Sequence, residues 1–232
     1  MDRRLNYNML RTRTLLKKKI IGISPEEATN GIYIYHNNGK LYKSEEWHKE
    51  WNNNAVGVAV ITSDCRFVID KANDSPNKLL WGNGRTFIEG ATYSPDVIDS
   101  YYDYEGKTNT DAIVSTFSNS RYAAKYCRLC NYYINSTKIE GYLGAAGEWK
   151  KAIDNRVTID KIISLIDGEP LHFSEENWIT EYSYHTSTQG DMKYKNVYAA
   201  NYSGANFGSS AYPIGSTSQT NEHYVRPFYE LN

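Results

Sequence analysis

The spacing of hydrophobic residues changes twice along this chain, and this order constrains the fold more than any other feature. Between residues 31 and 70, apolar and tyrosine side chains alternate along short runs bounded by turn signals, which is typical of antiparallel strands. From about residue 108 to 168 the spacing becomes helical, as in the stripe of Ile159, Ile162, Ile163 and Ile166. After residue 177, short segments rich in tyrosine, serine, glycine and asparagine return. Strands, then helices, then strands predict an α+β fold rather than a doubly wound sheet.

The clearest local signal in the first part is a hairpin over residues 31–44. Asn38-Gly39 separates two alternating runs, and this dipeptide favours a type I′ turn because both positions tolerate a positive φ. Residues 55–61 and 65–70 then predict two more strands around a tight turn.

The segment GYLGAAGEWKKAID, residues 141–154, has three glycines at a spacing of three. A dinucleotide fingerprint needs G-x-G-x-x-G after a buried strand, and a phosphate-binding Walker loop needs Gly-Lys-Ser or Gly-Lys-Thr; neither pattern occurs. We therefore interpret the glycines as a tight approach to a helix, with Glu148 in its first turn and Trp149 in the core.

Metal and nucleophile patterns are also missing. Cys127 and Cys130 lie on a helical stripe within 121–133, so we interpret them as core residues, ahead of redox chemistry or a zinc site. The five histidines show no metal-ligand spacing, and no nucleophile elbow occurs. The sequence thus predicts no catalytic residues, no metal site and no cofactor.

The first 19 residues form a basic arm with one acidic residue. A flexible or partner-ordered tail, docking into a larger protein assembly and nucleic-acid binding are all compatible with it, in decreasing order of preference. The apolar stretch after Lys19 is too short for a signal peptide, and no run is long enough to cross a membrane, so we expect synthesis in the cytoplasm without export. The candidate attachment residues are Arg3, Arg4, Arg11, Arg13, Lys17, Lys18 and Lys19.

The last part of the chain is rich in tyrosine and poor in charge. Residues 184–232 contain seven tyrosines and six charged residues. Tyrosine with serine, glycine and asparagine is typical of recognition surfaces, although half-buried tyrosines in an ordinary sheet would give the same composition.

Several motifs now occur in a recognisable order. GIYIYHNNGKLYKSEEW, AVGVAVITSDCRFVI, LLWG, TNTDAIV, YAAKYC, GYLGAAGEWKKAIDN, YHTSTQ and YVRPFYEL together cover residues 31–231. In this order they resemble the C-type-lectin-like domains of phages and prophages of gut bacteria, which are related to formylglycine-generating enzymes and to the variable proteins of diversity-generating retroelements. The resemblance implies short helices packed on a small antiparallel sheet, in which the STQ strand pairs with the VRPF strand.

The resemblance also implies a division of the chain and a binding face. Residues 1–30 would be the arm, 31–75 a β-hairpin region, and 76–232 the lectin-like domain with a display interval at 190–223. The candidate ligand contacts in that interval are Lys193, Tyr194, Lys195, Tyr198, Asn201, Tyr202, Asn206, Phe207, Tyr212, Gln219, Asn221 and His223.

Two properties of the family do not carry over. The loop and strand motifs of calcium-dependent sugar-binding lectins are missing, and no cysteine follows Cys130, so neither calcium binding nor formylglycine chemistry is implied. Variation by a retroelement is a property of neighbouring DNA, which one protein sequence does not report.

The resemblance implies a phage virion protein without enzymatic activity, as part of a fibre, tail tip or capsid decoration. It would recognise a host surface glycan or protein receptor, contact other virion proteins through the arm, and form a homo-oligomer, with a trimer as one option. Two alternatives stay open: a purely structural subunit of a virion or surface filament, and an enzyme on a formylglycine-generating-enzyme-like fold.

Overall fold

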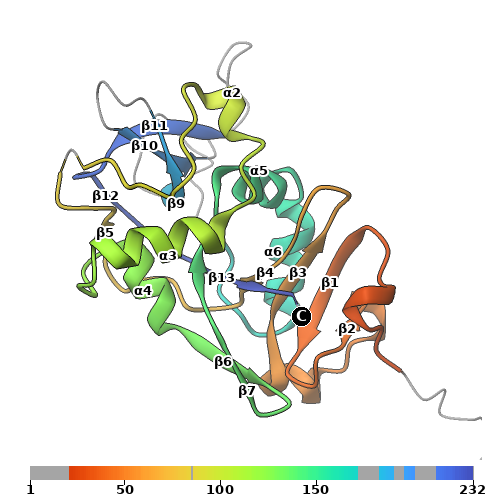
Figure 1. The fold of residues 1–232 in the computed structure, drawn as a ribbon. Helices are drawn as coiled ribbons and strands as arrows, with labels where there is room; N and C mark the ends of the chain where they lie inside the picture. Colours follow the sequence, from red (N-terminus) through yellow and green to blue (C-terminus); the bar gives the residue numbers. More distant parts are fainter. Residues whose placement is uncertain (1–20, 85, 172–182, 191–195, 202–212, 232) are drawn as a thin grey trace, which may run out of the picture.

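The computed structural model describes residues 21–84, 86–171, 183–190, 196–201 and 213–231. These residues form small antiparallel sheets and a few short helices, which confirms the predicted α+β class. Figure 1 shows the larger sheet at one end of the molecule and the C-terminal sheet at the other.

The larger sheet has six strands in the order β2-β1-β3-β4-β13-β8, and every pair is antiparallel. Its C-terminal strand β13 lies between β4 and β8, so one sheet joins residues on both sides of the division expected at residue 75. The strands are β1 (Gly31–His36), β2 (Leu41–Tyr42), β3 (Ala55–Ile61), β4 (Arg66–Asp70), β8 (Tyr142–Leu143) and β13 (Pro227–Glu230).

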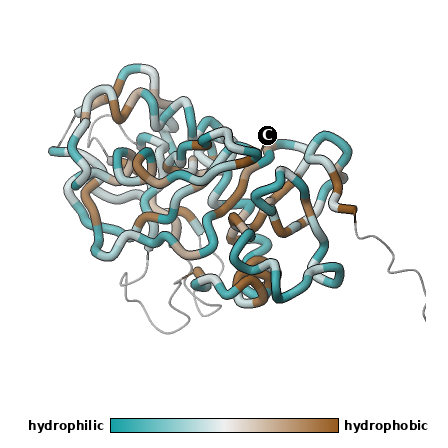
Figure 2. Tube along the Cα trace, turned by 90° about the horizontal axis from the view of Figure 1, so that it is seen from below, coloured by the Kyte–Doolittle hydropathy of each residue, from teal (hydrophilic) through white to brown (hydrophobic). Residues whose placement is uncertain are grey.

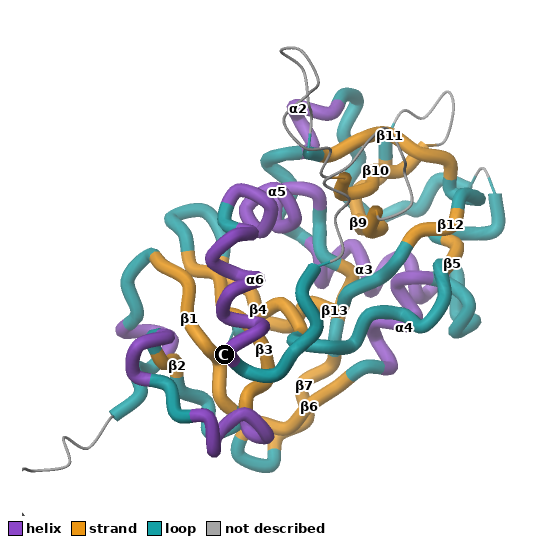
Figure 3. The backbone as a smooth tube through the Cα atoms, turned by 180° about the vertical axis from the view of Figure 1, so that it is seen from behind, coloured by secondary structure: helices purple, strands orange, loops and turns teal. Residues whose placement is uncertain are grey.

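Side chains that alternate along these strands point to opposite faces of the sheet, and each face packs into an apolar layer. Val58 and Phe228 face one cluster, which the helices α5 (Ala146–Asp154) and α6 (Arg156–Leu165) cover with Trp149 and the isoleucine stripe. Figure 3 shows α6 lying across β1, β3 and β4. Tyr35 and Tyr229 face the opposite layer, where Tyr132 packs against them.

The type I′ turn occurs at a different place from the one predicted. At the β1–β2 turn, Gly39 has a φ of 77° but Asn38 stays out of the left-handed region. Instead, Asn135 (φ 46°) and Ser136 (φ 71°) join β6 (Asn131–Ile134) to β7 (Thr137–Glu140). The helix expected over 121–133 is shorter in the structure and ends at Leu129. The last residues of the expected range, from Asn131 onward, belong to this hairpin.

A third cluster fills the space between the two sheets. It contains Trp81, Ile113 and Cys127, so Cys127 lies in the core as predicted. The short helices α3 (Gly106–Thr116) and α4 (Ala123–Leu129) contribute to it, whereas Val97 of α2 (Val97–Ser100) packs against the first cluster. Three 3₁₀ segments, 25–27, 44–46 and 49–54, lie at the N-terminal end of the described chain.

The C-terminal sheet has the order β11-β10-β9, from β9 (Ser183–Gln189), β10 (Asn196–Asn201) and β11 (Ile214–Ser218). The expected pairing of the STQ strand, β9, with the VRPF strand, β13, is wrong. Both edges of β13 are occupied, because Phe228 pairs with Ile69 of β4 and with Tyr142 of β8. The two segments meet just before β13, through a parallel bridge between Tyr184 and Tyr224.

Hydrophobic residues occur in short stretches along the trace, separated by polar ones (Figure 2). Among the described residues, no helix has the length and apolar character that crossing a membrane requires.

Candidate functional site

Strand β9 supports the start of the display interval, and all seven of its residues are buried although every one of them carries a polar group. A buried polar group is costly unless it is hydrogen-bonded. Thr186 Oγ1 donates to the Tyr198 carbonyl at 3.0 Å, and Trp81 Nε1 donates to the Thr186 carbonyl at 2.9 Å. The strand is therefore held by hydrogen bonds rather than by apolar packing alone.

A buried polar network lies beneath the C-terminal half of β9. Thr188 Oγ1 donates to Asp103 Oδ2 at 2.6 Å, and Asn109 Nδ2 donates to the same oxygen at 3.0 Å. Asn109 also reaches Ser187 Oγ at 3.2 Å, and Thr188 accepts the Ala146 N–H at 2.9 Å. The network connects β9 to the first turns of α3 and α5, which fixes the strand on the helical layer.

Two buried glutamines connect the ends of the interval to the segment 86–91. Gln189 accepts the Ile88 N–H at 2.7 Å and donates to the Ile88 and Ala91 carbonyls at 2.9 and 3.0 Å. Gln219 accepts the Thr86 N–H at 3.1 Å and donates to the Thr86 carbonyl at 2.6 Å. Each side-chain amide thus pairs with backbone as a neighbouring strand would.

Two buried histidines meet where β9, β5 (Leu79–Leu80) and β12 (Glu222–His223) come together. The ring centroids of His185 and His223 are 4.7 Å apart with an interplanar angle of 87°. His185 Nε2 lies 2.9 Å from the Leu79 carbonyl, while the His223 nitrogens contact the Ser183 and Thr217 hydroxyls. Burial and His223 lower the pKa of His185 to about 3, and burial and Lys78 lower the pKa of His223 to about 4. Both rings are therefore neutral at pH 7.

The structure corrects three of the candidate ligand contacts. Tyr198 and Gln219 are each 2% exposed and His223 is 8% exposed, so the expectation that they face a ligand is wrong. Strand β10 is the central strand of its sheet and is covered on both faces, which buries Val197 and Tyr198 in different clusters. Side chains that alternate along such a strand are buried on either face, so none of the described ones is available to a ligand. Gln219 and His223 are used by the hydrogen bonds described above.

The other candidates are placed less fully. Asn221 is exposed, as expected. Asn201 ends β10, and the structure does not describe its side chain. The remaining candidate ligand contacts and all the candidate attachment residues lie outside the described residues: Lys193, Tyr194, Lys195, Tyr202, Asn206, Phe207 and Tyr212, and Arg3, Arg4, Arg11, Arg13, Lys17, Lys18 and Lys19.

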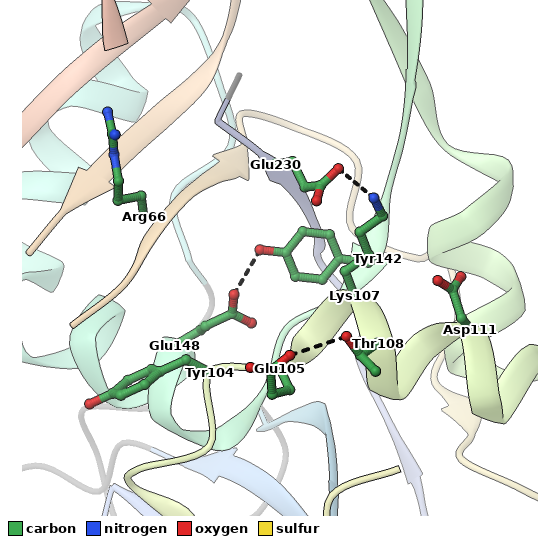
Figure 4. Close-up of a pocket in the computed structure, with 9 residues that line it drawn as sticks. All are labelled: Arg66, Tyr104, Glu105, Lys107, Thr108, Asp111, Tyr142, Glu148 and Glu230. Carbon is green, nitrogen blue, oxygen red and sulfur yellow. Dashed lines mark hydrogen bonds and ion pairs between the residues drawn. The ribbon is translucent and has the colours of Figure 1, made fainter. Parts of the chain in front are cut away.

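A polar pocket of about 350 Å³ lies away from this face, between α3, β8 and β13 (Figure 4). Two of its charged groups, Lys107 and Glu230, pair with each other, and Glu105 accepts a hydrogen bond from a hydroxyl of the lining. Lys107 Nζ lies 2.6 Å from Glu230 Oε2, and Thr108 Oγ1 donates to Glu105 Oε2 at 3.1 Å. Among the residues that the structure describes, the lining contains no histidine or cysteine; it consists of Arg66, Tyr104, Glu105, Lys107, Thr108, Asp111, Tyr142, Glu148 and Glu230.

Glu148 lines the pocket and lies in the first turn of α5, directly after the last of the three glycines. It accepts the Ala145 N–H at 2.7 Å, at the start of α5, and the Tyr142 hydroxyl at 2.7 Å. Burial raises the pKa of Glu148 to about 8, although these two hydrogen bonds favour the charged form. Glu148 in the first turn and Trp149 in the core confirm the interpretation of this segment as a helix start.

Gly106 packs directly against this carboxyl, and a side chain there is expected to destabilise the fold. A Cβ at residue 106 would contact Glu148 Oε2 and lie 2.7 Å from Tyr142 Cε2 and 2.9 Å from Ala145 N. We expect Gly106→Ala to lower the free energy of unfolding by about 1–3 kcal/mol, as overpacking does. Thr108→Ala, at an exposed position of the same helix, should change it by less than about 0.5 kcal/mol. Urea denaturation of both variants checks this, and equal midpoints would contradict the close packing.

The thiols are poor nucleophiles where they lie. Burial raises the pKa of the Cys127 thiol well above its usual value and that of Cys130 to about 11. Within the described ranges, no group of three or more histidine, cysteine, aspartate or glutamate side chains is arranged to hold a metal ion.

Comparison with known proteins gives one structural neighbour. No family model matches the sequence, and no curated protein matches it. The fold is similar to that of a fimbrial protein from Bacteroides ovatus, with a TM-score of 0.52 and 11% sequence identity. The match covers 88% of this chain and 49% of the fimbrial protein, so this chain spans about half the length of its neighbour. At this identity the likeness concerns the fold alone.

Proposed function

We propose that this chain is a binding module of a surface filament or virion fibre, which recognises another macromolecule through the interval 190–223. The observation that carries the proposal is the frame around that interval. Strand β9 is buried along its whole length, and Gln189 and Gln219 are hydrogen-bonded to the same backbone segment. A rigid frame at both ends of a tyrosine-rich interval lowers the entropy cost of binding, as in other recognition loops.

The setting on a filament is supported by the fimbrial neighbour, whose fold resembles this one. The finer proposal, a lectin-like phage protein with a host receptor, is supported by the motif order described above. In both settings the basic arm would attach the module to neighbouring subunits, and copies on one particle would add avidity. The mechanism is binding without a chemical step.

The interval is tested by replacing tyrosines and phenylalanine that the sequence places there. The triple variant Tyr202→Ala, Phe207→Ala, Tyr212→Ala is expected to bind cells at least about tenfold more weakly, since truncating an aromatic anchor of a recognition surface costs on the order of 1 kcal/mol or more. Binding of fluorescently labelled protein is measured by flow cytometry on intact cells of a panel of gut bacteria that includes Bacteroides ovatus. The melting temperature should stay within about 2 °C of the original.

Tyr133→Ala is the matched control, because Tyr133 is 58% exposed on the β6–β7 hairpin at the opposite end of the molecule. It should bind cells as well as the unaltered protein does. If the unaltered protein binds no strain, or the triple variant binds as well as the control, the proposed function is wrong.

A purely structural subunit is the second candidate, and the fimbrial neighbour favours it equally. In that case the interval 190–223 would be covered by another copy in an assembled filament. The triple variant would then lose assembly, measured by analytical ultracentrifugation, while the binding of monomers to cells would stay unchanged.

A further inference from the structure

Two exposed aromatic rings lie beside the display interval but outside it. Phe87 is 42% exposed and Tyr93 is 38% exposed, and their ring centroids are 6.4 Å apart at an interplanar angle of 73°. Large apolar side chains on a surface are ordinary when they stand alone. Here two of them contact each other, which makes a small apolar knob.

The backbone that carries this knob is held from several sides. Gln219 bonds both the N–H and the carbonyl of Thr86, and Gln189 does the same for Ile88. At the far end, the Ser94 N–H donates to the Gln189 carbonyl at 2.9 Å, and the Tyr198 hydroxyl donates to the Ser94 carbonyl at 3.2 Å. The rings are thus presented on a fixed backbone rather than on a free loop, which is the preorganisation that binding hot spots use.

The knob borders the start of the interval. Gln189 is the last residue of β9 and directly precedes residue 190. Tyr93 forms a parallel bridge with Gln189, and the Gln189 N–H donates to the Thr92 carbonyl at 2.9 Å. Figure 1 accordingly shows the segment between β5 and α2 running beside β9 and β10. A macromolecule bound at the start of the interval, next to Gln189, would therefore lie close to Tyr93 and to Phe87, whose ring contacts it.

We propose that Phe87 and Tyr93 form a fixed apolar part of the recognition face and insert into an apolar recess on a partner protein. This inference rests on the proposed function, because it extends the same face. The ring geometry favours a protein partner over a glycan. In an edge-to-face pair one ring covers part of the face of the other, so the pair offers a protruding knob instead of the open flat face on which a sugar ring stacks. Aromatic anchors seated in partner pockets carry much of the affinity of protein interfaces.

The test compares the double variant Phe87→Ala, Tyr93→Ala with Tyr133→Ala in the same cell-binding assay. We expect the double variant to bind at least about tenfold more weakly and the control to bind within about twofold of the unaltered protein. Both variants should keep the original melting temperature, because the replaced side chains are exposed. Treating the cells with proteinase K should abolish binding, and oxidising their glycans with periodate should leave it unchanged.

The outcomes separate this inference from the proposed function. If the interval variant loses binding but the Phe87 and Tyr93 variant does not, the knob is not part of the face and this inference is wrong while the function stands. Loss of binding after periodate but not after proteinase K would overturn the protein partner and leave a glycan in its place. If neither variant changes the binding, both proposals are wrong.

Discussion

Replacing Arg226 by methionine is expected to lower the free energy of unfolding by about 3–5 kcal/mol, because it removes the positive charge that compensates a nearly buried carboxylate. The Arg226 side chain is fully buried and pairs through Nε with Asp74, whose side chain is 9% exposed. Its other nitrogens donate to the carbonyls of Asp70 and Glu169, each at 3.0 Å. One guanidinium therefore ties the end of β4, the segment after α6 and the chain before β13 together.

Urea denaturation measures the loss, and a surface pair supplies the matched control. Lys107 and Glu230 lie 2.6 Å apart with side chains that are 46% and 43% exposed. Lys107→Met should cost no more than about 1 kcal/mol, as exposed ion pairs do. If Arg226→Met does not fold at all, Arg226→Lys keeps the charge but not the fork of donors and should still unfold at a lower urea concentration. A loss under about 1 kcal/mol for Arg226→Met would contradict the buried pair.

The sequence predicted the features that depend on local periodicity. The isoleucine stripe of α6 lies in the core, and the alternating runs of β1, β3 and β4 form neighbouring strands. Helix α5 begins where Glu148 predicted it, because a carboxylate at that position accepts backbone N–H groups that have no partner inside the helix. In each case the residues that decide the structure lie within a few positions of one another.

The features that depend on distant partners were missed. Nothing in SYHTSTQ itself predicts a strand that is buried on both faces, since its polar groups find partners in Trp81, Asp103 and Ile88. Tyr198 was expected at the surface because the composition of the C-terminal segment is typical of recognition surfaces. In the structure, β9 and β11 flank its strand, β10, and apolar clusters cover both faces of that strand.

The histidine pair predicts a pH-dependent stability that the buried carboxyl of Glu148 conceals. A histidine whose folded pKa lies below the unfolded value of 6.5 stabilises the fold above pH 6.5, and this contribution is lost as the pH falls toward the folded pKa. Glu148 acts in the opposite direction. Its folded pKa is raised to about 8, so its contribution is present below its unfolded value of 4.5 and is lost as the pH rises through 8.

Between pH 7 and pH 5 the two histidines together are expected to lower the free energy of unfolding by about 4 kcal/mol, since each ring binds a proton in the unfolded state over most of this range and stays neutral in the folded state. Over the same range, protonation of Glu148 is expected to raise the free energy of unfolding by about 2–3 kcal/mol. The unaltered protein should therefore show only a shallow dependence. Glu148→Gln removes the opposing contribution while its amide still accepts the Ala145 N–H, so in this variant acidification should expose the histidine effect almost in full.

The groups around His185 and His223 are consistent with lowered pKa values for both rings. The hydrogen-bonding neighbours of the two rings are carbonyls and hydroxyls, and the charged neighbour is Lys78, which disfavours a second positive charge. The Glu148→Gln variant should lose stability steeply between pH 7 and pH 5. We expect this fall in the free energy of unfolding to disappear when His185→Gln and His223→Gln are added. Should those variants fail to fold, titration of the histidine ring protons by NMR in the unaltered protein gives the same answer. Two of the four described rings should stay neutral at pH 5, and a titration of all of them near pH 6.5 would show that the pair is not buried as described.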